Sequence, residues 1–553
     1  MNPPDEGLTT PGALADPKST VSTISDAAAP PGFGPVAGQE RIEVLDILRG
    51  FALLCILIVN WTVNTHWDTD LWGGFSGTAD QVAYWTLKFL LDEKSWPMFT
   101  FLFGLGFAIQ VQRARARAAP FVATYIRRLV VLFLIGGAHF ILTERDILYE
   151  YALLGLLLLP LRQLRPNLLL ALALTWLLVG FTLDARMAYD RLARLASETD
   201  AKVESALSPT ALVAYVGEYK LTSEPHTIFV TSKGGSLFAQ SPGYRGDRDV
   251  PIRLFASSPV EFYSRSTSQR ISFERAASGA VTGLVLSEDG DNVSGRKVRG
   301  APFRMDDQVL RRASTQGPVD RVYATGSFLQ IVELRAALFA EAMRSWAMSY
   351  EKWLQSNLFP PFLLGVYAGR RRLFHEVAKH RQFFRHIMWG GLALGLVANA
   401  LPIMLDLLTQ NHPLGRRSIP FAVAALVGLL FDVGSPALGM AYLAALTLLL
   451  QGCLWRNFLA PLGAVGRMAL TNYLLQSVAF VLLFFGYGLG WYGQVGASAG
   501  LILALAFFAL QIALSRWWLT RFRFGPAEWV WRSATYGAWQ QLRLKMPAHN
   551  LVT

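Results

Sequence analysis

Residues 44–63 read VLDILRGFALLCILIVNWTV, an apolar run whose charged side chains stand near its start. A helix rises about 1.5 Å per residue, so a run of this length spans the ~30 Å hydrocarbon core of a bilayer. The stretch therefore predicts a first membrane-spanning helix. Its few polar groups then stand out against the apolar background.

Apolar runs of the same kind recur along most of the chain. Hydrophobic residues make up 52% of the sequence and charged residues 16%, whereas about a quarter of a soluble protein is charged. At about 20 residues each, the runs give roughly ten to twelve spans. The expected fold class is an all-α polytopic membrane protein whose main partner is the lipid bilayer. The further runs cover residues 95–111, 129–142, 147–161, 167–183, 349–367, 386–405, 419–431, 436–451, 470–485 and 499–518.

The net charge of +12 comes from Lys and Arg that adjoin the spans, so we do not attribute it to nucleic-acid binding. Basic clusters at 113–128, 162–165 and 370–385 follow every second span. The positive-inside rule makes these loops cytoplasmic and puts the N-terminus inside. Strict alternation then puts the C-terminus outside, although the tail after 518 is basic. We expect one late segment to be miscounted, broken or re-entrant.

One part of the chain has a different pattern. Runs such as 227–230 and 281–286 alternate polar and apolar residues between Gly, Asp, Ser and Pro turns. This period of two predicts a small antiparallel β-barrel or sandwich inserted between spans, on the extracytoplasmic side. The tail before the first span is rich in Pro, Ala, Gly, Ser and Thr and is expected to be disordered. The predicted division is a tail at 1–40, transmembrane helices at 41–190, the β domain at 205–300, transmembrane helices at 340–520 and an interfacial tail at 521–553.

Polar groups inside spans are costly and are the first candidates for function. Asp46 and Arg49 lie three residues apart, on one face of the first helix, and Asn60 lies farther along it. One interpretation is an ion pair and a capping group at the helix ends. The other is a site for a phosphate, a carboxylate or an acyl carrier at the inner mouth of a cavity.

His139 follows two glycines in an apolar run, and Asp146 lies seven residues later. Seven residues are two helical turns, so the two side chains share a face if the helix continues. A carboxylate beside an imidazole fixes its tautomer and raises its basicity, as a general base requires. The alternative is an ordinary hydrogen bond between helices.

A late span starts with a polar face. It predicts either a water-filled cavity or polar packing between helices. The segment 525–537, with Trp, Tyr and Arg, suits an anchor at the membrane interface. Nothing in the sequence indicates a metal site, and Cys55 and Cys453 lie in apolar stretches. The residues of the polar face are Arg467, Thr471, Asn472, Gln476 and Ser477.

Four blocks of the sequence, taken in order, resemble the YeiB family of bacterial membrane proteins, whose C-terminal part is domain of unknown function 418. The insert, in turn, resembles a small lipocalin-like domain, domain of unknown function 3471. That domain usually accompanies β-lactamase-related serine hydrolases, and the hydrolase sequence is missing from this chain. The blocks are residues 45–60, 96–107, 139–153 and the pair 466–477 and 525–537.

The YeiB family is similar to transmembrane acyltransferases, which move an acyl group from a cytoplasmic donor to an extracytoplasmic acceptor. This resemblance implies roles for His139 and Arg49, with acyl-CoA as a possible donor, in the bacterial inner membrane. His66 is a second candidate, because lysosomal acetyltransferase relatives have a similar opening followed by a histidine. The alternatives are a transporter of a small solute or lipid precursor, and a sensor or scaffold with a ligand-binding β domain.

Overall fold

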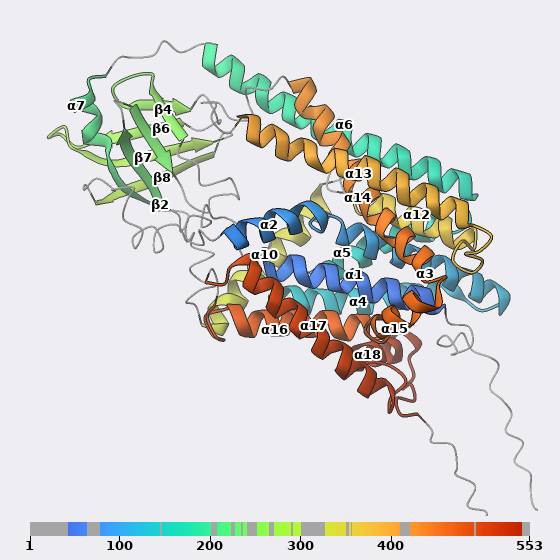
Figure 1. The fold of residues 1–553 in the computed structure, drawn as a ribbon. Coiled ribbons are helices and arrows are strands. Elements are labelled where there is room, and N and C mark those ends of the chain that lie inside the picture. The colour runs from blue at the N-terminus through green and yellow to red at the C-terminus, as the bar shows by residue number, and fades with distance from the viewer. Residues whose placement is uncertain are drawn as a thin grey trace, which may run out of the picture.

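The computed structural model shows a bundle of helices with a separate β-barrel at one end (Figure 1). This confirms the expected fold class. The predicted tail at 1–40 and His66 lie outside the described residues. The structure describes residues 42–544 except for 63–77, 144–145, 201–206, 223–226, 234–235, 241–251, 265–269, 289–290, 300–326, 350–352, 355–356, 410–420 and 492–493.

The helices fall into two groups that flank the barrel in the sequence. The first group is α1 (Glu43–Thr62), α2 (Thr78–Leu90), α3 (Ser95–Ala116), α4 (Phe121–Thr143), α5 (Leu148–Leu161) and α6 (Pro166–Asp200), with the short α7 (Pro209–Leu212) and η4 (Val213–Tyr215) leading into the barrel. The second group is α10 (Phe328–Met348), α12 (Phe359–Arg370), α13 (Arg381–Thr409), α14 (Phe421–Leu449), α15 (Cys453–Arg467), α16 (Ala469–Phe484), α17 (Ala497–Leu519) and α18 (Pro526–Tyr536).

Six of the described helices are long and apolar enough to cross a membrane, and the bent pair α15 and α16 makes a seventh span if counted as one. The sequence suggested more spans because it also counted runs that form short helices, such as the 14 residues of α5 and the 12 of α12. The runs at 419–431 and 436–451 were expected to be separate. They form one helix, α14, with Pro436 inside it.

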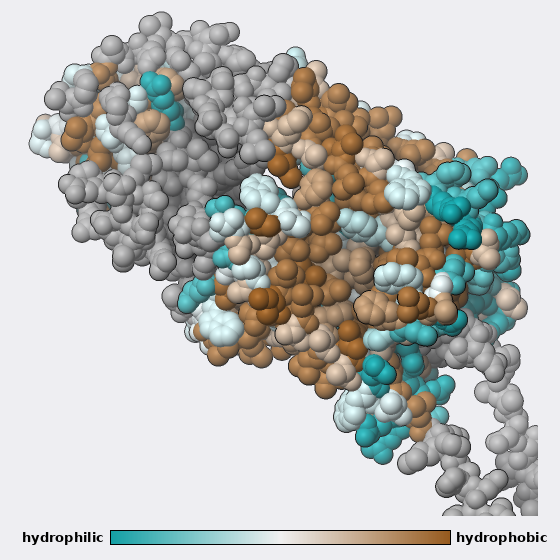
Figure 2. Space-filling model, viewed as in Figure 1, coloured by the Kyte–Doolittle hydropathy of each residue, from teal (hydrophilic) through white to brown (hydrophobic). Residues whose placement is uncertain are grey.

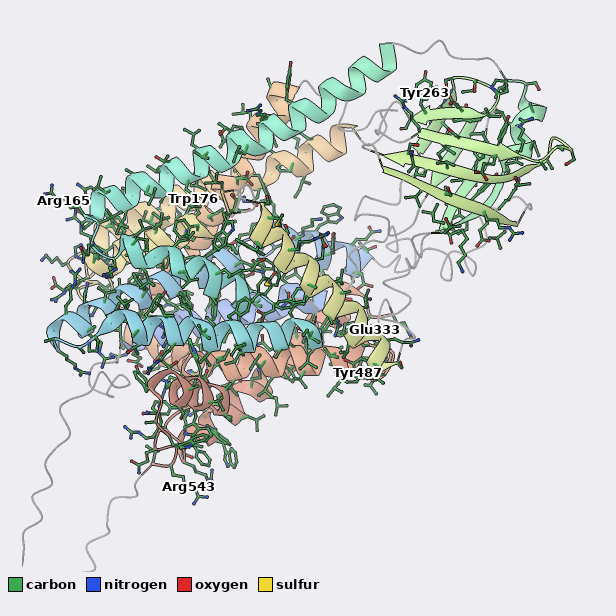
Figure 3. All side chains as sticks on the ribbon, turned by 180° about the vertical axis from the view of Figure 1, so that it is seen from behind. Arg165, Trp176, Tyr263, Glu333, Tyr487 and Arg543 are labelled. Carbon is green, nitrogen blue, oxygen red and sulfur yellow. The ribbon has the colours of Figure 1, made fainter. Side chains whose placement is uncertain are left out.

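The bundle has two polar ends and an apolar middle. Arg165 and Arg543 lie at the end away from the barrel, and Glu333 and Tyr487 lie at the end that faces it (Figure 3). We call these the distal end and the barrel end. Hydrophobic residues cover the surface between them, and hydrophilic residues gather at the distal end (Figure 2). Large side chains on this surface, such as Ile502, are mostly exposed, as expected of a lipid-facing surface.

The insert is a closed, eight-stranded antiparallel barrel in which each strand pairs with the next and β1 with β8. Aromatic rings fill its interior: Tyr215 and Tyr219 pack against Phe273, and Tyr215 and Phe273 against Phe262, with ring centroids 4.9–5.6 Å apart. Side chains thus occupy this part of the barrel, as is usual for eight strands. The strands are β1 (Gly217–Leu221), β2 (Thr227–Lys233), β3 (Ser236–Gln240), β4 (Ile252–Ala256), β5 (Glu261–Ser264), β6 (Arg270–Arg275), β7 (Val281–Glu288) and β8 (Asp291–Arg299).

Glycines allow α1 and α15 to cross closely. A Cβ atom at Gly466 would overlap the carbonyl oxygen of Asp46, and one at Gly50 would overlap that of Leu462. Without a hydrophobic force between helices in lipid, such close backbone contact is a main source of helix association. This crossing fixes where α16 begins, because α16 follows α15 directly.

A carboxylate from α18 holds the sharp bend between α15 and α16, which meet at 80°. Glu528 accepts hydrogen bonds from the backbone N–H groups of Leu470 and Thr471 at 2.7 and 3.3 Å, and from the Thr471 hydroxyl at 2.6 Å. Burial raises the pKa of Glu528 above its usual range, and the hydrogen bond from Thr471 opposes this shift. An acidic group at a helix N-terminus is favoured by the helix dipole. The C-terminal segment therefore caps α16, in addition to any role at the interface.

Replacing Gly466 with Ala should destabilise the protein by ~1–3 kcal/mol, because the added methyl group forces α1 and α15 apart. Thermal unfolding of the purified protein in detergent measures the loss. Gly428→Ala on α14 is the matched control, since a Cβ there meets nothing within 4 Å. Equal melting temperatures for the two variants would contradict the close crossing.

Replacing Glu528 with Ala should lower the melting temperature, because the N–H groups of Leu470 and Thr471 lose their buried acceptor. Each such loss costs about 1–3 kcal/mol. Glu528→Gln keeps one acceptor oxygen and should be less damaging. If the alanine variant has the same melting temperature as the wild type, Glu528 is not the cap of α16.

Candidate functional site

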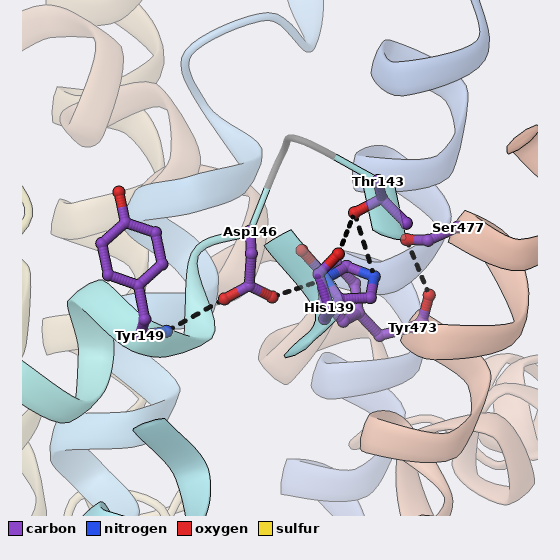
Figure 4. A network of polar contacts seen from close by, with 6 residues as sticks. All are labelled: His139, Thr143, Asp146, Tyr149, Tyr473 and Ser477. Atoms are coloured by element: carbon purple, nitrogen blue, oxygen red, sulfur yellow. Dashed lines mark hydrogen bonds and ion pairs between the residues drawn. The ribbon is translucent and has the colours of Figure 1, made fainter. Parts of the chain in front are cut away.

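His139 and Asp146 form a buried pair near the barrel end of α4 (Figure 4). Nδ1 of His139 lies 2.6 Å from Oδ2 of Asp146, and the two side chains are 4% and 0% exposed. The other carboxylate oxygen of Asp146 accepts the backbone N–H of Tyr149 at 2.9 Å. Both carboxylate oxygens are thus engaged, and the ring of His139 is held by its Nδ1 atom.

The pair forms by a different route from the one expected. The spacing of seven residues predicted a shared face on a single continuing helix, but α4 ends at Thr143 and α5 begins at Leu148. Asp146 lies between them and caps the start of α5. Gly136 makes room for it, because a Cβ at that position would lie 2.6 Å from Oδ1 of Asp146.

The other ring nitrogen of His139 faces Thr143. Oγ1 of Thr143 lies 3.5 Å from Nε2, while its hydroxyl donates to the carbonyl oxygen of His139 at 2.9 Å. The Tyr473 ring packs beside the imidazole, with centroids 5.0 Å apart. When Nδ1 carries the proton toward Asp146, Nε2 presents its lone pair. That is the state in which an imidazole accepts a proton.

A small cavity with polar and apolar walls adjoins Thr143, and His139 is outside its lining. Its volume is about 30 Å³, which is room for about one or two water molecules. Three of the residues proposed from the sequence line it, namely Asn60, Gln476 and Ser477, although they come from two helices. The complete lining is Leu57, Asn60, Trp61, Thr143, Tyr473, Gln476, Ser477 and Phe480.

A buried chain of amide groups leads from the α15–α16 bend to this cavity. Asn472 donates to the carbonyl oxygen of Val465 at 3.2 Å, and Gln511 donates to the backbone oxygen of Asn472 at 2.9 Å. Gln476 donates to Oε1 of Gln511, also at 2.9 Å. Ser515 completes the network through a 3.0 Å hydrogen bond from Asn472.

The remaining predicted residues lie elsewhere. Arg49 and Asp46 pair at 3.1 Å toward the distal end of α1. Asn60 is eleven residues beyond Arg49, about 16 Å along the helix. The structure therefore separates Asn60 from the proposed anion site and does not bring Arg49 to His139. Thr471 binds Glu528 instead of lining the cavity, and Arg467 ends α15.

Sequence reasoning missed three kinds of residue around the site. Arg335 of α10 is fully buried and donates to the carbonyl oxygen of Leu142 at the end of α4. Phe339, also of α10, packs on Phe140, with ring centroids 5.3 Å apart. These two residues of α10 are the first kind. The second kind is the pair Gln511 and Ser515 of α17, and the third is Glu528 of α18. Polar residues in the apolar run 499–518 were a usable signal for Gln511 and Ser515, whereas nothing local indicated the partners of Arg335 or Glu528.

Among the described residues, no group of three or more His, Cys, Asp or Glu side chains could hold a metal ion.

Comparison with known proteins finds relatives that are described as uncharacterized. Residues 368–538 match the family described as "Protein of unknown function (DUF418)". The uncharacterized protein YxaH of Bacillus subtilis (strain 168) is 29% identical over 92% of this chain and 98% of its own length. An uncharacterized 39.9 kDa protein in the amylase 3' region of Bacillus acidopullulyticus is 24% identical over 93% of this chain and 99% of its own length.

The uncharacterized protein YeiB of Escherichia coli (strain K12) is 42% identical over 77 residues, which are 14% of this chain and 20% of that protein. No solved structure matches the chain. The resemblance expected from the sequence is confirmed at the level of the family, and the barrel adds a domain within the helix series. The chain is thus similar to YeiB and matches the DUF418 family over residues 368–538, and it carries an eight-stranded β-barrel inserted between α6 and α10.

Proposed function

We propose that the protein is a transmembrane acyltransferase in which His139 is the general base and Asp146 orients it. The observation that carries this proposal is the 2.6 Å contact between Nδ1 and the carboxylate, which leaves Nε2 directed at Thr143, a residue of the cavity lining. A general base contributes about 10²–10⁴-fold to a rate.

The proposed reaction moves an acyl group from a thioester to an acceptor. His139 takes a proton from the acceptor as it attacks the thioester carbonyl, and Asp146 stabilises the imidazolium that forms. Acyl-CoA is the proposed donor, with its phosphates at the basic distal end near Arg49. Because Arg49 is about 16 Å from Asn60 along α1, the thioester end of the donor has to extend along that helix to reach the cavity.

A second candidate is transport. The amide chain from Asn472 through Gln511 to Gln476 runs inside the bundle and ends at a cavity, which is an arrangement found along substrate pathways. Uptake into sealed vesicles without an acyl donor separates the two candidates. Accumulated but chemically unchanged solute favours transport, and a covalent product favours the enzyme.

We further propose that the distal end is cytoplasmic and the barrel extracytoplasmic. The distal end carries the basic loops, as the positive-inside rule requires. Because α14 is one helix, the sequence-based count loses one crossing. The location of Arg543 at the distal end in Figure 3 supports a C-terminal segment on the same side as the basic loops.

His139→Gln and Asp146→Asn should each lower acyl transfer at least about a hundredfold, since the first removes the base and the second its orienting charge. Transfer of radiolabelled acetyl groups from acetyl-CoA to membrane extracts measures the loss. His386→Gln, on an exposed position of α13, is the matched control. Normal transfer by a folded His139 variant would exclude this histidine as the base.

The side of the barrel can be measured by cysteine labelling. In a Cys453→Ser background, Ser278→Cys in the β6–β7 turn should react with a membrane-impermeant maleimide in spheroplasts, whose cytoplasmic membrane is still closed. Arg372→Cys, after α12, should react only once the membrane is opened, because the basic loop faces the cytoplasm. The reverse labelling would invert the proposed topology.

A further inference from the structure

The direction of every hydrogen bond in the amide chain is set by two backbone carbonyls, which can only accept. The carbonyl of Val465 requires the amide nitrogen of Asn472, and that of Asn472 requires the amide nitrogen of Gln511. Oε1 of Gln511 therefore points to Gln476 and accepts from its Nε2 atom. Consequently, Gln476 must direct its own oxygen away from the chain.

That oxygen is an acceptor without a donor. Gln476 is 4% exposed and lines the cavity, and its Oε1 atom has no hydrogen-bond partner among the described residues. A buried polar atom left unpaired costs about 1–3 kcal/mol. A ligand that supplies a hydrogen at this point removes the cost, so the orphan oxygen indicates what the cavity binds.

The neighbouring wall groups are also acceptors. The hydroxyl hydrogen of Thr143 goes to the carbonyl oxygen of His139, and that of Ser477 to the carbonyl oxygen of Tyr473. Both side-chain oxygens thus present lone pairs. Nε2 of His139, which lies 3.5 Å from Oγ1 of Thr143 and outside the cavity lining, also presents a lone pair when Nδ1–H faces Asp146.

We propose that the cavity recognises a primary amine and, resting on the acyl transfer proposed above, that this amine is the acyl acceptor. Gln476 is the positioning residue. A primary amine has two N–H bonds, one for Oε1 of Gln476 and one for the base. An alcohol has a single O–H bond and can satisfy only one of the two acceptors.

The proposed step balances as follows. The neutral amine nitrogen attacks the thioester carbonyl, so that a C–N bond forms and the C–S bond breaks. One amine hydrogen moves to Nε2 of His139 and from there to the departing thiolate, which leaves as a thiol. The second hydrogen stays on the product amide and keeps its hydrogen bond to Gln476.

The transfer experiment compares two small acceptors with acetyl-CoA as the donor and the full chain in lipid nanodiscs. Activity of the His139→Gln variant is subtracted as background. Gln476→Met should raise the KM for methylamine about tenfold, because the variant loses one hydrogen bond and a tenfold change corresponds to ~1.4 kcal/mol. The KM for methanol should stay unchanged. Ser435→Ala, which removes a buried 2.8 Å hydrogen bond to Asn399 elsewhere, should change neither.

Equal effects of Gln476→Met on methylamine and methanol, or a preference of the wild type for methanol, would overturn the amine assignment. Restored methylamine kinetics in Gln476→Glu, which keeps an acceptor oxygen, would support it. If Gln476 has only a structural role, Gln476→Met and Ser435→Ala should have the same effect on the KM values for methylamine and methanol.

A binding experiment separates this inference from the acyl transfer itself. Methylammonium chloride should raise the melting temperature of the wild type in a concentration-dependent way, and Gln476→Met should remove the rise. Tetramethylammonium chloride has the same charge and no N–H bond, so it should have no effect. A rise with methylammonium in the absence of any transfer would keep the amine site and reject the enzyme. Equal responses to the two cations would reject the amine site.

Discussion

Hydrocarbon offers no hydrogen-bond partners, so every polar group inside the bundle has to find one within the protein. The structure meets this constraint in a connected way. Glu528 satisfies the start of α16, the amides of Asn472, Gln511 and Gln476 satisfy one another, and Asp146 satisfies both His139 and the start of α5. The buried polar groups are therefore parts of networks, and their orientations follow from fixed backbone atoms.

The same constraint makes departures from full pairing informative. In the amide chain, the pairing ends at the oxygen of Gln476, which lies at the cavity beside Thr143. Thr143, a residue of the cavity lining, lies between this cavity and His139, with its Oγ1 atom 3.5 Å from Nε2.

The barrel is connected to this site through α10, the helix that follows it in the sequence. The segment after β8 leads to α10, which packs Phe339 on Phe140 and directs Arg335 to the end of α4. The barrel interior is filled by its own aromatic side chains around Phe273. These rings occupy interior space that a ligand would need, which leaves the outer surface of the barrel for contacts with other molecules.

The sequence by itself determined the apolar helices, the β insert, the family resemblance and the pairing of His139 with Asp146, because hydropathy, period-two alternation and short spacing are local properties. The tertiary structure decided which polar groups meet. The capping of α16 by Glu528 and the cavity that α1 and α16 line together depend on contacts between distant segments. Such contacts are set by close helix packing at residues such as Gly466, and a one-dimensional pattern does not contain them.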